Sequence, residues 1–137
     1  MVKNGFLHCH TMYSLFDSAI TPNDLVKRAK ELGAENITLT DHGTLLGIEP
    51  FMDAGKEYGI NTIPGVELYL ANREHFILFA KNYTGYQAIS KTMRNANYET
   101  SKRNKKGEEG SQKSYACVPD NVLSQLKGNK DIIATTA

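Results

Sequence analysis

The sequence predicts an α/β fold built around a parallel β-sheet. Short apolar runs alternate with amphipathic segments along the 137 residues, which is the pattern of strand and helix units in such a sheet. One run, residues 75–81, is apolar on both faces, as expected of a strand that is covered on both sides. With 40% hydrophobic and 23% charged residues, the chain is expected to form one globular domain over residues 1–137.

The first two elements are indicated by a short apolar run and by helix caps. Residues 5–10, GFLHCH, predict a strand. Residues 21–33 predict a helix, because Thr21 can serve as N-cap, Pro22 suits the first helical position and Gly33 can end the helix. The residues expected to form its buried stripe are Leu25, Val26, Ala29 and Leu32.

The rest of the chain continues the same alternation. Pro50 is compatible with a helix only because it lies in the first turn, and Gly59 ends that helix. Residues 99–114 contain no aliphatic or aromatic side chain, so 99–116 is expected to be an exposed, flexible loop. The remaining expected elements are strands at 36–43, 60–70, 75–81 and 131–136, and helices at 48–59, 84–97 and 118–128.

Net charge says little about the partners of this protein, and cysteine content favours a reducing compartment. A formal net charge of +1 gives no overall electrostatic attraction for nucleic acid or for an anionic membrane, although a local patch could still bind either. Cys9 and Cys117 are far apart and no signal-like segment precedes them, which favours a reduced cytoplasmic protein without disulfides. No apolar run approaches the roughly 20 residues of a membrane span.

Two histidines in the first predicted strand point to a metal site. Alternate side chains of an extended chain lie on the same face, so His8 and His10 share a face, while Cys9 faces the other way. Two neutral imidazoles side by side are typical metal ligands. All four histidines, including His42 and His75, lie in or at the ends of predicted strands, where α/β folds collect functional groups.

Carboxylates accompany these histidines. Asp17 follows the first strand, Asp41 precedes His42 at the end of another, and Glu67 lies between apolar neighbours in PGVELY, where it needs a partner. Imidazole nitrogens and carboxylate oxygens together suit Zn, Mn or Fe.

Each of these residues also has a structural interpretation. His75 can be a satisfied core residue, His42 can cap a turn, and Asp17 can be an N-cap or a turn residue. Asp41 can orient a histidine from outside the ligand set, and Glu67 can pair with a buried Arg or Lys. One metal cluster accounts for all of them together.

The motifs HCH, Asp17, TDHG, GVE and HFILFAKN, in this order, resemble the polymerase and histidinol phosphatase (PHP) superfamily. The segments LVKRAKELG, TLTDHGTLLG, IPGVELYL and FAKNYTGYQAISK resemble, more narrowly, the amino-terminal PHP domain of bacterial DNA polymerase III alpha subunits. This resemblance implies a PHP-type distorted (β/α)7 TIM-like barrel, here a partial one, an amino-terminal fragment whose parallel sheet is truncated after about five strands.

The resemblance also implies a site for up to three divalent metal ions. His8 and His10 would bind one metal, Glu67 would bridge two, and His75 would bind the second. Asp17 and His42 would hold the third, with Asp41 beside them outside the ligand set. Asp17, His42 and Glu67 are the residues expected to take part in catalysis.

The implied chemistry is metal-dependent phosphoester hydrolysis of the 3′–5′ exonuclease type, in a parent DNA-directed DNA polymerase whose nucleotidyl transfer lies outside these residues. DNA, the rest of the polymerase chain and replisome subunits would be the partners, and the fragment is expected to self-associate. The alternatives are a non-catalytic structural or binding module of the polymerase, and a free-standing histidinol-phosphatase-like phosphoesterase.

Overall fold

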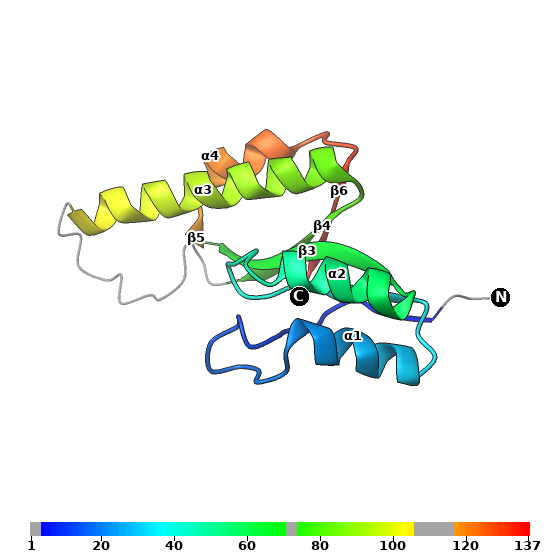
Figure 1. Ribbon diagram of the computed structural model, residues 1–137. Helices are drawn as coiled ribbons and strands as arrows, with labels where there is room; N and C mark the ends of the chain where they lie inside the picture. The colour runs from blue at the N-terminus through cyan, green and yellow to red at the C-terminus, as the bar shows by residue number, and fades with distance from the viewer. Residues whose placement is uncertain (1–3, 71–73, 106–116) are drawn as a thin grey trace. The chain divides into compact units, whose positions relative to one another are not determined.

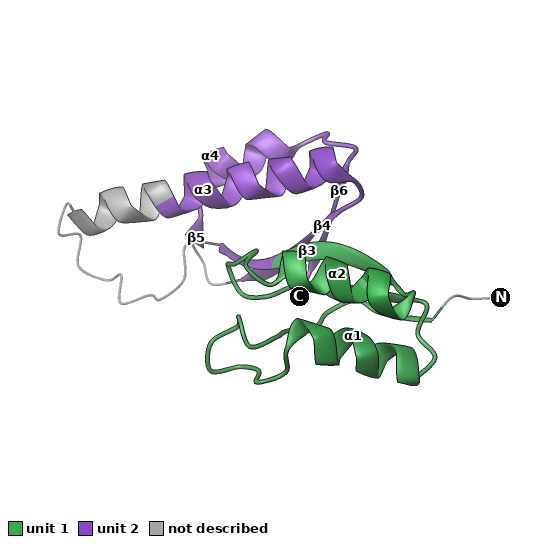
Figure 2. Ribbon diagram, viewed as in Figure 1, with its two compact units in different colours: residues 1–66 green, residues 67–137 purple. Residues whose placement is uncertain are grey.

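The structure, a computed structural model, describes residues 4–70, 74–105 and 117–137, with the backbone alone over residues 98–105. It contains two compact units, residues 1–66 and 67–137 (Figure 2). Strand β3, Asn61–Leu70, continues through the boundary between them. The single domain expected over 1–137 therefore stays a prediction. Within the described ranges, no helix combines the length and the apolar character needed to cross a membrane.

The first unit contains three parallel strands and two helices. Besides the start of β3, its elements are β1 (Gly5–Phe6), α1 (Pro22–Glu31), β2 (Asn36–Leu39) and α2 (Ile48–Tyr58). The strands pair in the order β1, β2, β3, with Asn36 beside Asn61 at the start of the β2–β3 ladder. Helices α1 and α2 pack against each other (Figure 1).

Helix α1 begins as its sequence predicts. The Thr21 hydroxyl accepts a hydrogen bond from the Asp24 backbone N–H at 3.1 Å, which satisfies one of the unpaired donors of the first turn. Val26 and Ala29 are buried, as expected. Leu32, in contrast, is 57% exposed. It is the C-cap residue and lies beyond the last helical turn, so it leaves the buried stripe.

The strands that lead to the predicted histidines are shorter than expected. Strand β1 ends at Phe6 and β2 ends at Leu39, so the histidines and Asp41 lie in the segments that follow. Backbone and side-chain hydrogen bonds join the two segments there, including one from the Thr40 N–H to the Cys9 carbonyl at 2.9 Å. The Thr38 hydroxyl donates to the Phe6 carbonyl, and the Thr40 hydroxyl accepts from the Cys9 N–H and donates to the Cys9 carbonyl.

The second unit contains the end of β3, three more strands and the remaining helices. These elements are β4 (His75–Ala80), α3 (Tyr83–Lys105), β5 (Cys117–Val118), α4 (Asp120–Leu123), the 3-10 helix η1 (Ser124–Leu126) and β6 (Ile132–Thr136). The strands pair in the order β3, β4, β6, and β5 pairs with β3 in parallel.

The expectation that all strands run parallel is wrong for this unit. Strands β4 and β6 are antiparallel, with Phe76 opposite Thr136. Only four residues separate β3 from β4, fewer than the dozen or more that a parallel crossover needs, so a parallel arrangement of these two strands is not expected from the spacing. The α/β class itself is confirmed, with six strands among the described residues.

Helix α3 is longer than the sequence predicts. The backbone is helical through Lys105, so residues 99–105 are helix rather than loop, and 106–116 lie outside the described residues. The absence of apolar side chains excludes burial in a core. It does not exclude a solvated helix, because Lys, Arg and Glu have high helix propensity.

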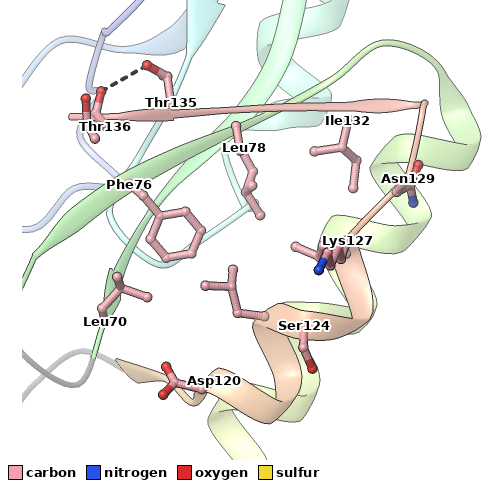
Figure 3. Close-up of a pocket in the computed structure, with 13 residues that line it drawn as sticks. Leu70, Phe76, Leu78, Asp120, Ser124, Lys127, Asn129, Ile132, Thr135 and Thr136 are labelled. Carbon is pink, nitrogen blue, oxygen red and sulfur yellow. Dashed lines mark hydrogen bonds between the residues drawn. The ribbon is translucent and has the colours of Figure 1, made fainter.

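A groove in the second unit is lined mainly by apolar side chains. It has a volume of about 760 Å³ and lies between strands β4 and β6 and the segment of α4 and η1. Figure 3 shows Phe76, Leu78 and Ile132 projecting from the strands toward that segment. Its lining contains no histidine or cysteine, so the groove offers packing surface rather than metal ligands.

Candidate metal centre

The two histidines that follow β1 lie side by side. The Nε2 atoms of His8 and His10 are 2.8 Å apart, and the ring centroids are 4.8 Å apart. The shared face predicted from alternate positions therefore exists, although both residues lie beyond the end of the strand. The side chain of His10 is only 15% exposed, while His8 is exposed.

The hydroxyl of Ser14 determines which nitrogen of His10 carries the proton. This hydroxyl has one hydrogen, which it donates to Asp41 Oδ1 at 2.7 Å, since a carboxylate can only accept. It must then accept from its two other partners, the His42 backbone N–H at 3.1 Å and His10 Nδ1 at 3.0 Å. The proton of His10 therefore lies on Nδ1. Its Nε2 carries the lone pair, which accepts a hydrogen bond from the Nε2–H of His8 at 2.8 Å and which a metal ion would need in its place.

Asp41 is a buried carboxylate that neutral donors satisfy. It is 1% exposed and accepts from the Thr11 N–H at 2.6 Å, the Thr11 hydroxyl at 2.7 Å and the Ser14 hydroxyl. Gly47 lies against it, because a Cβ at that position would come within 3.0 Å of Asp41 Oδ2. Asp41 thus anchors the segment from residue 11 to residue 14 below the histidines.

Asp17 lies between two histidine rings. Its Oδ2 is 3.5 Å from His10 Nδ1 and 3.5 Å from His42 Nε2, and the two ring centroids are 4.3 Å apart. The turn that directs it there includes Phe16, which adopts a φ of 68°, a conformation that a bulky residue rarely takes. One ligand atom from each of His10, Asp17 and His42 can be chosen so that all lie within 4.8 Å of one another.

The second unit holds its own pair of predicted ligands. Glu67, on β3, is 2% exposed, and its Oε1 accepts a hydrogen bond from Nδ1 of His75 at 2.5 Å. His75 begins β4, and the edge of its ring meets Tyr69 with centroids 4.3 Å apart. The bond to Glu67 again leaves the lone pair of the imidazole on Nε2. That this pair and the residues of the first unit share one centre stays a prediction.

Cys9 does not join the clusters of possible ligands. Burial raises the pKa of the Cys9 thiol, because a thiolate would lose solvation there. Among the described residues, the groups whose ligand atoms come together do not include Cys9.

Two residues of the site were not predicted. Thr11 and Ser14 carry no sequence signal of their own, because hydroxyl side chains in a loop are common and their partners lie about 30 positions away. The only hint is spacing, since Ser14 follows His10 by four residues.

Comparison with known proteins gives a consistent result. The sequence profile of the PHP domain matches residues 7–136. The DNA polymerase III alpha subunit of Helicobacter pylori is 42% identical over 94 residues, which cover 61% of this chain and 8% of that protein. The PolC-type DNA polymerase III of Thermotoga maritima is 49% identical over 71 residues, 52% of this chain and 5% of that protein. The chain thus spans under a tenth of the length of these relatives.

Two solved structures share the fold. A protein described as a metal-dependent phosphoesterase, from Bifidobacterium adolescentis, superposes with a TM-score of 0.59 over 96% of this chain and 46% of its own, at 24% identity. An amidohydrolase from Chromobacterium violaceum, with bound sulfate and no metal, superposes with a TM-score of 0.58 over 75% of this chain and 36% of its own, at 24% identity.

Proposed function

Because this chain belongs to the PHP domain family, we propose that it provides a metal-dependent phosphoesterase site within a DNA polymerase III-type polymerase. The observation that carries the proposal is the convergence of His10, Asp17 and His42 in the first unit, with ligand atoms within 4.8 Å. Two imidazoles and one carboxylate form a donor set that suits Zn, Mn or Fe, and up to three such ions are expected in a complete site.

The proposed metal ligands come from both units. His8, His10, Asp17 and His42 would hold metal in the first unit, and Glu67 and His75 would supply the ligands of the second. Divalent ions, when bound, would lower the pKa of a water and stabilise charge on the phosphorus oxygens.

The remaining tasks fall to the chain itself. Ser14 and Asp41 keep the proton of His10 on Nδ1, so that the ring needs no rearrangement before it binds. Asp17 is 49% exposed, which leaves its carboxylate accessible to a substrate from solvent. Asp17, His42 and Glu67 are the proposed catalytic residues.

DNA is the proposed substrate, with hydrolysis from the 3′ end. The relatives named as DNA polymerase III subunits support this choice. The remainder of a polymerase chain, replisome subunits and a cytoplasmic location follow from the same proposal. Nucleotidyl transfer would belong to other parts of the parent polymerase.

Metal binding and hydrolysis can be measured on the same protein. The wild type, Asp17→Asn and the matched control Asp53→Asn, an exposed aspartate on α2, are compared by calorimetry with Zn²⁺ or Mn²⁺ and by degradation of 5′-labelled single-stranded DNA. We expect Asp17→Asn to lose at least about tenfold in metal affinity and in rate, with no change in the control.

The same experiment separates the alternatives. Metal binding without hydrolysis in the wild type would favour the non-catalytic module of a polymerase. Cleavage of histidinol phosphate but not of DNA would favour the free-standing phosphoesterase. Absence of metal binding in the wild type would contradict the proposal altogether.

Self-association stays a prediction. Strand β6 is last in the order β3, β4, β6, and Ile133 on it is 53% exposed. Unpaired strand edges and exposed apolar side chains both favour contact between copies. Light scattering over a concentration series should show a mass above that of one chain, reduced by Ile133→Lys, whereas a monomer at every concentration would contradict it.

A further inference from the structure

We propose that the solvent-facing side of helix α3 binds single-stranded nucleic acid. This side, called the α3 face below, is built from six residues at the start of the helix that line a shallow hollow of about 300 Å³. They are Tyr83, Tyr86, Gln87, Ser90, Lys91 and Arg94.

The orientation of the α3 face is fixed by the opposite side of the helix. Helix α3 packs with β4, β5 and α4, all within the second unit (Figures 1 and 2). The residues buried on that opposite side are Gly85, Ile89, Thr92, Met93 and Ala96. The apolar side of α3 is therefore buried within the second unit, and the α3 face is the side that a partner can contact.

The aromatic residues of the α3 face stand beside its cations. Side chains four residues apart in a helix are neighbours, which places Tyr83, Gln87 and Lys91 in one row. Tyr86, Ser90 and Arg94 form the adjacent row. The two tyrosine rings are 6.4 Å apart between centroids and inclined by 23°, and Tyr83 is 73% exposed.

The charge of α3 differs from that of the rest of the chain. Residues 83–105 include five Lys or Arg and one Glu, a net charge of +4, while the whole chain carries +1. The other residues therefore carry −3. Two of these cations, Lys91 and Arg94, lie on the α3 face, and neither forms an ion pair among the described residues. A local cationic surface of this kind attracts a phosphate backbone even when the whole protein is nearly neutral.

Aromatic rings next to cations favour one kind of partner. Exposed bases of a single strand stack on tyrosine while Lys and Arg neutralise its phosphates, and this combination is the usual basis of binding without sequence preference. A duplex hides its bases from such rings, and an acidic peptide would use the cations alone. A membrane surface would need the apolar side of α3, which is buried. The inference is independent of the proposed hydrolysis, because it needs no metal.

Binding can be tested on the whole chain without metal. The probe is a fluorescein-labelled 20-nucleotide oligothymidylate in EDTA, followed by anisotropy over a series of salt concentrations. The variants are Tyr83→Ala, the double variant Lys91→Glu with Arg94→Glu, and the control Lys27→Glu on the exposed side of α1 in the first unit. Circular dichroism establishes that each variant is folded.

We expect saturable binding, with the logarithm of the affinity falling linearly with the logarithm of the salt concentration. The double variant should lose at least about tenfold in affinity, and its salt slope should fall by about 1.4, the value for two phosphate contacts on a single strand. Tyr83→Ala should lose about tenfold with an unchanged salt slope, because it removes stacking but no charge. Lys27→Glu should bind almost as the wild type does.

Several results would overturn the proposal. These are no binding at low salt, equal affinity of the wild type and the double variant, or a loss with Lys27→Glu as large as with the double variant. Competition by polyglutamate or by anionic lipid vesicles as strong as that by unlabelled oligonucleotide would also overturn it, since charge alone would then account for binding. If the double variant does not fold, Tyr83→Ala decides, because its ring is mostly exposed.

Discussion

Asp41 in the first unit and Glu67 in the second are equally buried carboxylates that reach their histidines by different routes. Asp41, 1% exposed, accepts three hydrogen bonds from Thr11 and Ser14 and influences His10 only through the Ser14 hydroxyl. Glu67, 2% exposed, bonds directly to His75.

The difference concerns what a buried carboxylate can do. A carboxylate whose donors are backbone and hydroxyl groups cannot turn toward a cation without leaving those donors unsatisfied, so Asp41 positions other groups. A carboxylate bonded to an imidazole has a partner of a type that can bind metal. As it stands, Glu67 orients His75, and its proposed ligation of an ion would use its other oxygen or replace this hydrogen bond.

The largest effect is expected from Asp41→Ala. Three buried donors would lose their acceptor, at about 1 kcal/mol or more each, so the free energy of unfolding should fall by about 3 kcal/mol or more. Urea denaturation followed by circular dichroism measures this loss. Asp53→Ala, at an exposed position on α2, should change stability by less than about 0.5 kcal/mol. A comparable loss in both variants would contradict the anchoring role of Asp41.

The next effect is expected from Ser14→Ala. Without the hydroxyl, His10 Nδ1 and the His42 N–H lose their acceptor, which should cost about 1–2 kcal/mol in unfolding free energy. Zinc affinity should fall about tenfold, because the ring of His10 is no longer oriented. Calorimetric titration with Zn²⁺ measures the affinity, with Ser90→Ala as the exposed serine control. An unchanged affinity would mean that the route from Asp41 to His10 has no role in binding.

Glu67→Gln separates orientation from ligation in the second unit. The amide oxygen can still accept from His75 Nδ1, so the unfolding free energy should fall by only about 1 kcal/mol. Metal affinity should nevertheless fall, because the charged ligand is lost. If Gln keeps the full affinity of the wild type, Glu67 acts only by orienting His75, and the contrast with Asp41 disappears.

The smallest effect is expected from Phe16→Gly. Its φ of 68° costs a non-glycine residue about 1–2 kcal/mol, and relief of this strain is largely offset by the added freedom of glycine in the unfolded chain. We expect a net gain of about 0.5 kcal/mol relative to Phe16→Ala, measured by thermal unfolding. A glycine variant less stable than the alanine variant would show that the turn before Asp17 is not strained.

Local signals predicted the helices of the first unit well. Thr21, Pro22 and Gly33 set the limits of α1, and Gly59 ends α2 in the left-handed conformation. Such caps act over a few residues and can be read directly from the sequence. The length of β1, in contrast, depends on pairing with residues about 30 positions away, which no local pattern contains.

The candidate residues were chosen by chemistry and by resemblance, and the structure sorts them between the two units. Residue type was sufficient to select His10, Asp17 and His42, which do come together. Two features of the second unit were not predicted. The antiparallel pairing of β4 and β6 was missed because the short link between β3 and β4 was not taken into account. The extension of α3 was missed because the added turns consist of residues with high helix propensity but contain no apolar side chains to mark them. The roles of all six candidate ligands stay predictions.

A serine hydroxyl with a single hydrogen acts here as a directional relay. The Asp41 carboxylate accepts that hydrogen bond and has no hydrogen to donate. The direction of the hydrogen bonds from His10 through Ser14 to Asp41 is therefore set by a buried residue. The basic nitrogen of His10 is thus chosen during folding, before any ion arrives. Capture of an ion at Nε2 would then require no ring flip of His10, although it would displace the hydrogen bond from His8.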